Sequence, residues 1–368
     1  MAYAAVKGGT EAIENACRLL ANERTKGRSL PLNVDQIRDQ LYLLVDRVMG
    51  EGSLYAPDLA ALAVKQSAGD TLEASFMIRA YRATQPRIAY SLPTTTKNMR
   101  IVRRISAAFK DIPGGQVLGP TSDYTLRLLD FDLLEETAKS RETLKRSLES
   151  KIPAGMKLPN AFPKIVEILR QEGLLVPGLN AQQKDGNKTK IFDITRNALT
   201  FPAPRSAALQ SMARGETGGM LAIAYSSMRG YGNIHPTIGE LRVGYVPLWI
   251  AHPYTKKPYW AGEVKVTEAE VVARFDNPDG KPMFTLGYGL CFGQNEIKAI
   301  SMAILDRSMQ AAEAKNPAQD QEFVLSHTDG IEAMGFCNHW KLPHYVDFQS
   351  DLDRLRKAQR IHDDSRVD

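Results

Sequence analysis

Cysteine is scarce in this sequence, and long apolar runs are missing from it. The three cysteines, Cys17, Cys291 and Cys337, lie far apart, and none belongs to a CxxC pair. A disulfide framework is therefore not expected, and a reducing compartment fits. No apolar stretch approaches the ~20 residues that a membrane span needs, and the first residues contain no apolar signal region. The sequence predicts a cytoplasmic protein with no membrane association.

A strong charge of one sign is also absent. Lys and Arg number 47 and Asp and Glu 42, which gives a net charge of +5. This excess is too small to indicate nucleic acid, and no stretch interleaves aromatic with basic residues, so we expect no nucleic-acid partner. It suits an anionic small substrate or an acidic protein partner equally well. The P-loop signature and the G-x-S-x-G elbow are missing, which argues against a P-loop NTPase and a serine hydrolase.

What is present is an ordinary globular composition, with 43% hydrophobic and 24% charged residues among 368, a length that allows about two domains. Helix signals dominate the first half. Helices are predicted to begin at Thr10, at the capping box of Asn33 and Gln36, at Pro57, and at Asp70. Their apolar stripes indicate core packing.

Residues 99–110 alternate basic and apolar side chains at helical spacing, which predicts a helix. Its cations, Arg100, Arg103, Arg104 and Lys110, suit phosphates, but a solvated face or a contact with an acidic partner explains them as well. Further helices are expected over residues 124–131 and 161–170. Residues 135–159 are expected to form a peripheral helix or a tolerant insertion.

The second half mixes helix and strand signals. A helix is predicted over 216–228, strands around 241–245 and 264–266, and a turn at 276–280. The fold class is therefore α+β, a helical N-terminal part followed by a mixed α/β C-terminal domain. We divide the chain into a mainly helical domain 1–175, a linker or long loop 176–190, and a mixed α/β domain 191–368.

A glycine-rich stretch, 287–293, lies between a predicted short strand at 283–286 and a predicted helix at 294–314, with Asn295 as a candidate N-cap. A strand, a glycine loop and a helix N-terminus together present backbone N–H groups to a phosphate. The spacing is one residue longer than the dinucleotide fingerprint. The alternative is a tight corner with close backbone packing, and the loop alone favours this alternative.

Two clusters carry side chains suited to chemistry. Asp320, Glu322 and His327 flank a short strand-like run, a pattern typical of general acids, general bases or sugar ligands, or else of a surface loop. His339 and His344 flank Pro343, and a loop there can place both imidazoles on one ion. Two ligands are too few for zinc, so Cys337, water or another subunit would have to complete the site. Two hydrogen-bonded loop histidines are the alternative.

Several long strings, taken in order, resemble the I-subunit family (PhnI) of the bacterial carbon–phosphorus lyase core complex. The matching strings are 5–9, 45–49, 103–106, 110–116, 118–121, 229–232, 287–290, 319–325 and 341–349. Residues 135–190 do not match, so the resemblance assigns them no function.

The resemblance implies a transferase of phosphonate catabolism. With the G, H and L subunits, the family replaces the adenine of ATP by methylphosphonate at the ribose anomeric carbon, which gives ribose 1-methylphosphonate 5-triphosphate; alone it resembles a purine nucleosidase. Radical cleavage of the C–P bond belongs to the iron–sulfur J subunit, and this chain lacks the clustered cysteines of such a centre. The K subunit is a further expected partner. The family's zinc, held at the contact with J, is carried over to His339 and His344.

The reaction suggests roles for the candidate residues. Asp320 and Glu322 are candidates to stabilise positive charge on the ribose, and His327 is a candidate to protonate the purine. The candidates to bind the triphosphate with Mg²⁺ are Gly287, Tyr288, Gly289, Arg229 and Lys298. The competing hypothesis is a non-catalytic scaffold that organises the complex through residues 99–110 and the loop around His344.

Overall fold

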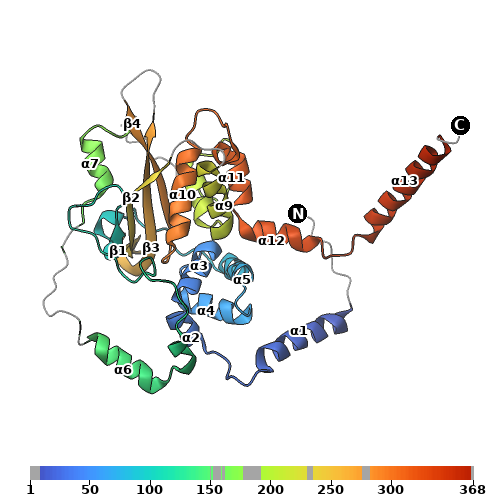
Figure 1. Ribbon diagram of the computed structural model, residues 1–368, viewed down its shortest axis with the longest axis horizontal. Helices are drawn as coiled ribbons and strands as arrows, with labels where there is room; N and C mark the ends of the chain where they lie inside the picture. The colour runs from blue at the N-terminus through green and yellow to red at the C-terminus, as the bar shows by residue number, and fades with distance from the viewer. Residues whose placement is uncertain are drawn as a thin grey trace.

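The computed structural model describes residues 9–149, 151, 159, 162–176, 192–229, 235–275 and 282–365. Over these residues the chain forms one antiparallel sheet in the order β1-β2-β3-β4, with helices packed on it and beside it, which confirms the α+β class (Figure 1). The strands are β1 (Arg100–Ile105), β2 (Thr237–Ala251), β3 (Pro258–Phe275) and β4 (Met283–Phe292). The helices are α1 (Thr10–Thr25), α2 (Val34–Gln40), α3 (Tyr42–Gly52), α4 (Pro57–Gln66), α5 (Thr71–Thr84), α6 (Ala138–Glu149), α7 (Ile165–Gln171), α8 (Arg205–Ala213), α9 (Thr217–Met228), α10 (Glu296–Ser308), α11 (Gln321–His327), α12 (Gly330–His339) and α13 (Tyr345–Asp364). Short 3-10 turns are η1 (Thr96–Asn98), η2 (Phe131–Glu135) and η4 (Pro317–Gln319).

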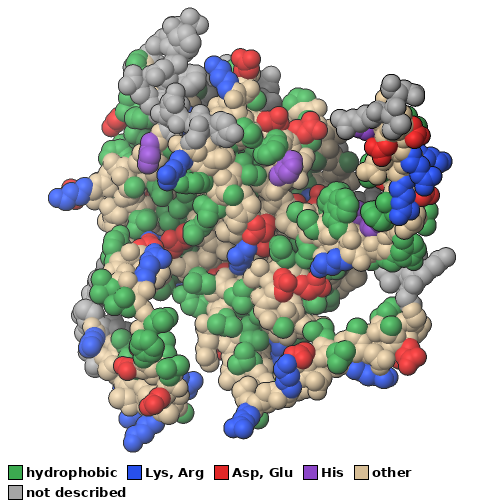
Figure 2. All heavy atoms as spheres, turned by 45° about the vertical axis from the view of Figure 1, so that its right-hand side comes forward, with side chains coloured by type: hydrophobic (Ala, Val, Ile, Leu, Met, Phe, Trp, Pro, Cys, Tyr) green, Lys and Arg blue, Asp and Glu red, His purple; other side chains and the backbone are tan. Residues whose placement is uncertain are grey.

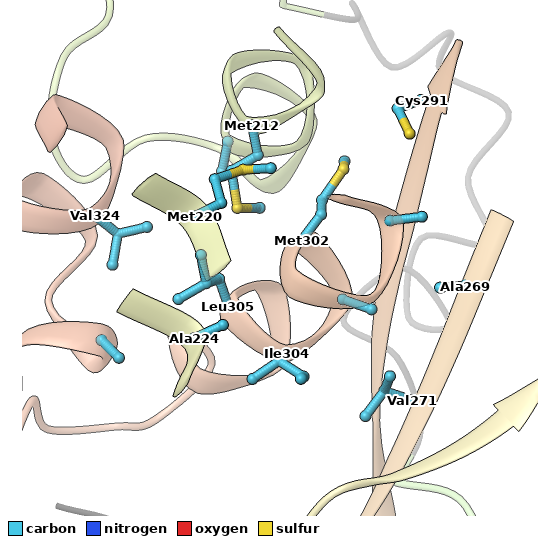
Figure 3. Close-up of a cluster of buried hydrophobic side chains, with 14 of the residues drawn as sticks. Met212, Met220, Ala224, Ala269, Val271, Cys291, Met302, Ile304, Leu305 and Val324 are labelled. Atoms are coloured by element: carbon cyan, nitrogen blue, oxygen red, sulfur yellow. The ribbon is translucent and has the colours of Figure 1, made fainter. Parts of the chain in front are cut away.

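The sheet has two unlike faces, because side chains along a strand alternate between them. Small and apolar side chains of one face, here called the core face, pack against α8, α9 and α10. Figure 3 shows Ala269, Val271 and Cys291 on the strands and Met302 and Leu305 on α10 within this core. The opposite face, here called the polar face, carries charged side chains next to valines. Its polar members are Glu240, Arg242, Glu268, Glu270 and Tyr288.

The predicted glycine loop is wrong, because residues 283–292 form one continuous strand, β4. A Cβ atom on Gly289 would lie 2.0 Å from the carbonyl oxygen of Ala299, and one on Gly287 would lie 1.9 Å from that of Ala303. These glycines therefore let α10 approach the strand backbone, which is the close packing of the alternative interpretation. The turn into α10 comes only at Gly293, whose φ is +74°.

The helical part follows its sequence signals closely. Asn33 and Gln36 form the predicted capping box, and Asp70 accepts from the backbone N–H groups of Leu72 and Glu73. Helices α2–α5 enclose a core of their own, separate from that of the sheet. Arg79 on α5 joins this bundle to the rest of the chain, because its Nη1 donates to both carboxylate oxygens of Asp329, at 2.9 and 2.7 Å.

The helix predicted over 99–110 is wrong. Residues Arg100–Ile105 form β1, the edge strand that pairs with β2. Arg103 and Arg104 are fully buried in ion pairs rather than spread over a solvated face. The predicted helix at 124–131 is also wrong, because its apolar side chains are exposed and helical turns begin only with η2. Both predictions rest on the spacing of apolar residues alone, and this spacing contains no information about the distant strand with which a segment pairs.

The remaining expectations divide into three groups. Helix α6 supplies the expected peripheral helix, and α7 and α9 lie within the ranges predicted for them. Residues 177–190, the turn at 276–280 and the string 230–232 lie outside the described residues. The division at 176–190 stays a prediction, although β1 and α7, from the first range, both pack into the sheet.

Four helices, α1, α6, α12 and α13, have no buried residue. In Figure 1, α1, α6 and α13 lie at the margins of the molecule, and α12 leads from the body to α13. Within the described ranges, no helix combines the length and the apolar character needed to cross a bilayer.

Candidate functional site

The three predicted catalytic residues lie on the surface. The strand expected there is wrong, since residues Gln321–His327 form helix α11. Asp320 is the N-cap of this helix and accepts from the Phe323 N–H at 2.9 Å, while His327 stacks on the Phe323 ring. Asp320, Glu322 and His327 are all exposed. Asp320 thus has a structural task, and the catalytic roles of the three stay predictions.

The structure does not gather the predicted triphosphate ligands in one place. Gly287, Tyr288 and Gly289 have lost the loop on which their predicted phosphate contact depended. Arg229 is exposed after the end of α9 and donates to the Tyr225 hydroxyl at 2.9 Å. Lys298 is fully buried in α10, where burial lowers its pKa and its ammonium group meets no acceptor in the described part of the chain.

A different cluster forms on the polar face of the sheet, centred on the Glu268 carboxylate. Its Oε1 atom accepts three hydrogen bonds: from the Thr96 hydroxyl at 2.7 Å, from Lys164 Nζ at 2.6 Å and from the Tyr288 hydroxyl at 2.9 Å. No described residue donates to its Oε2 atom. Lys164, the residue before α7, also pairs with Glu270 at 3.1 Å. Three segments outside β3 thus converge on one pair of its carboxylates.

Burial controls the protonation of this cluster. It raises the pKa of Glu270 to about 7, with Lys164 acting against this rise and Glu268 adding to it. For Lys164, burial lowers the pKa, but Glu270 and Glu268 outweigh it, and the pKa lies above its ordinary value. Burial and the neighbouring Glu268 raise the pKa of Tyr288. Glu270 can therefore hold a proton near neutral pH while Lys164 remains an ammonium ion.

Buried arginines hold the cluster in position. Arg104 Nε donates to Glu240 at 2.5 Å, and Arg242 pairs with the same carboxylate at 2.8 Å. The Arg104 guanidinium also donates to the carbonyl oxygen of Pro163 at 2.7 Å, one residue before Lys164. These charge-assisted hydrogen bonds fix the segment that carries Lys164 against the sheet.

A cavity of about 340 Å³ opens beside Glu268. Its polar lining residues are Thr96, Lys164, Glu268 and Tyr288 at one end, and Thr94 and Thr95 at the other. Its apolar walls come from Val246, Leu248, Val264, Val266, Leu290 and Phe292. An apolar pocket with a few convergent polar groups is a typical ligand site. A larger hollow of about 520 Å³ runs along α6, but residues 137–147 alone line it, so it has no opposing wall.

The sequence prediction does not include this cluster, although the sequence contains a signal for it. In β3, Glu268 and Glu270 continue the alternation of Val264 and Val266, so they share the face of buried valines. Carboxylates at period two within a buried strand pattern need partners, and such partners often mark a site.

The two predicted metal ligands do lie together. His339 ends α12, His344 precedes α13, and their ring centres are 5.2 Å apart. The Nδ1 atom of His339 is bonded to the Phe336 carbonyl oxygen, and that of His344 to the Leu342 carbonyl oxygen at 2.6 Å. A carbonyl oxygen only accepts, so both Nδ1 atoms carry a proton, and in the neutral imidazole the Nε2 atom is then the one that offers a lone pair to a metal.

This geometry fits a shared ion. Two imidazoles bound to one tetrahedral zinc at about 2.0–2.1 Å have ring centres roughly 5 Å apart. Cys337 does not complete the site, since no group of three His, Cys, Asp or Glu side chains suited to a metal occurs in the described part of the chain. The pair is ringed by exposed apolar side chains, among them Phe336, Trp340 and Tyr345. Figure 2 shows such side chains on the part of the surface formed by α12 and α13.

Comparisons with known proteins agree along the whole chain. The sequence model of the family described as "Bacterial phosphonate metabolism protein (PhnI)" matches residues 2–362. The chain is 55% identical to the "Putative C-P lyase subunit protein HtxH" of Stutzerimonas stutzeri, over 98% of this chain and 96% of that protein. It is 46% identical to the "Alpha-D-ribose 1-methylphosphonate 5-triphosphate synthase subunit PhnI" of Escherichia coli, over 97% of this chain and 98% of that protein. The protein of the same name from Rhizobium meliloti is also 46% identical.

Proposed function

The chain belongs to the PhnI family of bacterial phosphonate metabolism, and we propose that it is the subunit of a ribose 1-methylphosphonate 5-triphosphate synthase in which adenine is displaced. In this transfer a methylphosphonate oxygen bonds to the ribose C1 atom of ATP. The bond from C1 to the adenine N9 atom breaks, and its electron pair leaves with the base, which takes up a proton. Without partner subunits, water replaces methylphosphonate and the chain acts as a purine nucleosidase.

The observation that carries this proposal is the buried carboxylate at the polar end of the cavity. Positive charge develops on the ribose as the glycosidic bond breaks, and a carboxylate next to C1 stabilises it. Glu268 lines the cavity, and its Oε2 atom has no donor among the described residues. We therefore assign the stabilisation of the ribose cation to Glu268, instead of the exposed Asp320 and Glu322.

The proton for the departing base comes from the same cluster. Glu270, with a pKa raised to about 7, holds a proton near neutral pH. Lys164 contacts both carboxylates and lines the cavity, so it links Glu270 to the base. Glu270 is the proton reservoir in this proposal, and His327, exposed on α11, is not required.

We further propose that His339 and His344 bind zinc together with the J subunit. Their free Nε2 atoms supply two of the usual three or four protein ligands, so another chain must supply the rest. A zinc ion held in this way fixes the turn between α12 and α13 against the partner. The G, H, K and L subunits and Mg²⁺ bound to ATP complete the proposed system.

A scaffold function is the second candidate. Helices α1, α12 and α13 have no buried residue, and they carry exposed apolar side chains, for example Trp340 and Phe348. These helices suit contacts with other subunits whether or not the chain is catalytic. Adenine release catalysed in the cavity is expected of the synthase subunit and not of a scaffold.

The test uses the complex assembled with its partner subunits, supplied with ATP, Mg²⁺ and methylphosphonate. Adenine release is followed by chromatography and the new phosphonate ester by phosphorus NMR. We expect Glu268→Gln to slow adenine release by about 100-fold or more while the complex still assembles. Glu313→Gln, which changes an exposed carboxylate, serves as the matched control. Unchanged turnover in Glu268→Gln would exclude this site, and no adenine release from the wild-type complex would favour the scaffold.

A further inference from the structure

We propose that the apolar part of the sheet cavity binds the purine base of the substrate, with the glycosidic bond at Glu268 and the triphosphate outside. This inference rests on the proposed function and assigns an orientation to the substrate within the same site. The base-binding walls are Val246, Leu248, Val264, Val266, Leu290 and Phe292, from strands β2, β3 and β4.

The size of the cavity carries the first step of the argument. At about 340 Å³ it lies at the lower end of the range of about 300–1,000 Å³ that is usual for small-molecule sites. A nucleoside triphosphate does not fit within it, whereas one planar ring system does. The cavity therefore holds one end of the substrate, and the other end lies outside.

The charge of the cavity lining decides whether the purine end or the triphosphate end of the substrate enters the cavity. Lys164 is the cation of the lining, and its ammonium group is already paired with Glu268 and Glu270. A triphosphate placed here would face the Glu268 carboxylate, while the cation of the lining is already committed, and like charges this close repel strongly. A neutral purine avoids this cost and buries its ring faces against apolar walls.

The walls also have the shape and firmness that a flat ring needs. Phe292 contacts Tyr55 edge to face, with ring centres 5.7 Å apart, which holds the Phe292 ring in place. Val246, Val264 and Val266 are buried and β-branched, so their rotamers are restricted. At the other end, Thr94 and Thr95 supply exposed hydroxyl groups for the polar edge of a base.

The orientation follows from these two ends. With the base among the apolar walls, its glycosidic nitrogen points to the polar end, where Glu268 and Lys164 lie. The ribose then sits at Glu268, and the triphosphate continues into solvent or toward a partner subunit. The residues that bind the base and those that act on the glycosidic bond are thus separate, and variants can distinguish them.

The experiment is photolabelling of the assembled complex with 8-azido-ATP, with excess ATP as competitor, followed by peptide mapping. We expect ATP-sensitive label on peptides containing residues 246–266 or 288–292. A second arm compares Leu248→Trp, which fills the cavity, with Ile297→Trp, which enlarges an exposed side chain on α10. We expect Leu248→Trp to raise the KM for ATP at least 10-fold with kcat nearly retained, and Ile297→Trp to change neither.

The outcomes separate this inference from the proposed function. ATP-sensitive label elsewhere, for example around residues 319–328, together with normal kinetics of Leu248→Trp, would overturn the base site and leave the synthase function standing. A wild-type complex that neither takes up label nor releases adenine would overturn both. Circular dichroism and melting of Leu248→Trp check that its fold is intact, and the mapping of label on the wild-type complex decides the matter if that variant fails to fold.

Discussion

Replacing Gly289 by alanine tests whether the glycines of β4 serve packing or phosphate binding. The new Cβ atom would lie 2.0 Å from the carbonyl oxygen of Ala299 and 3.0 Å from its carbonyl carbon. Side chains cannot relieve this contact, because both atoms belong to the backbone of α10. The helix must move away from the sheet by roughly 1 Å, and Ala299 and Ala303, both fully buried, then lose their contacts.

The cost follows from overpacking and from the voids that the movement opens. Overpacking by one methyl group usually costs about 1–3 kcal/mol, and a rigid backbone neighbour places this substitution at the upper end. Loosened contacts around Met302 and Leu305 add to it, so we expect a loss of about 3 kcal/mol or more in the free energy of unfolding. For a chain of 368 residues this corresponds to a fall of roughly 4 °C or more in the melting temperature.

The assay is thermal and urea unfolding of the full chain, followed by circular dichroism. The matched control is Gly335→Ala in α12, where no atom lies within 4 Å of the new Cβ and helix propensity favours alanine. We expect this control to be neutral or more stable by up to about 1 kcal/mol. If Gly289→Ala unfolds like the wild type and instead loses only its affinity for ATP, the packing argument is refuted and the phosphate prediction returns.

Three further predictions follow from the other sites. The pKa of Glu270 rises from its ordinary 4.5 to about 7 on folding, so the folded chain keeps this proton to a higher pH than the unfolded chain does. The free energy of unfolding should therefore fall by about 3 kcal/mol as the pH rises from about 4.5 to 7. Glu270→Gln should remove this pH dependence, measured by urea titrations at several pH values. His339→Ala should lower the zinc content of the purified complex, measured by mass spectrometry, whereas His362→Ala near the end of α13 should not; equal zinc in both would exclude the histidine pair. Asp320→Ala should cost about 1 kcal/mol as a lost helix cap and Asp320→Ser should regain most of it, but a stable Asp320→Ser variant that no longer releases adenine would restore Asp320 as a catalytic candidate.

Local signals in the sequence predicted the helical part well. Capping boxes and first-turn proline depend on contacts between residues three or four positions apart, so Asn33, Pro57 and Asp70 mark helix starts as expected. The α+β class also follows from the distribution of these signals. The closeness of His339 and His344 could be predicted for the same reason, since both residues lie near one turn.

The parts that failed depend on contacts between distant residues. Residues 100–105 have helical apolar spacing, but pairing with β2, more than 130 residues later, makes them a strand. The glycines of β4 resemble a loop until α10 is seen to pack on them. Glu268 needs Thr96, Lys164 and Tyr288 around it, and these come from three other segments of the chain. No local pattern contains that information, whereas the pattern of carboxylates and histidine around Asp320 is local.

The two faces of the sheet assign stability and chemistry to opposite sides of the same strands. In β4 the core face needs glycine so that α10 can approach, while the next residue, Tyr288, turns its hydroxyl to Glu268 on the polar face. Asp306 of α10 couples the two sides, because it accepts from the Tyr288 backbone N–H at 2.9 Å. A shift of α10 would therefore move Tyr288 as well as loosen the core. Gly289→Ala should consequently disturb catalysis as well as stability, whereas Leu248→Trp, which acts on the polar face alone, should change the binding of ATP without loosening α10.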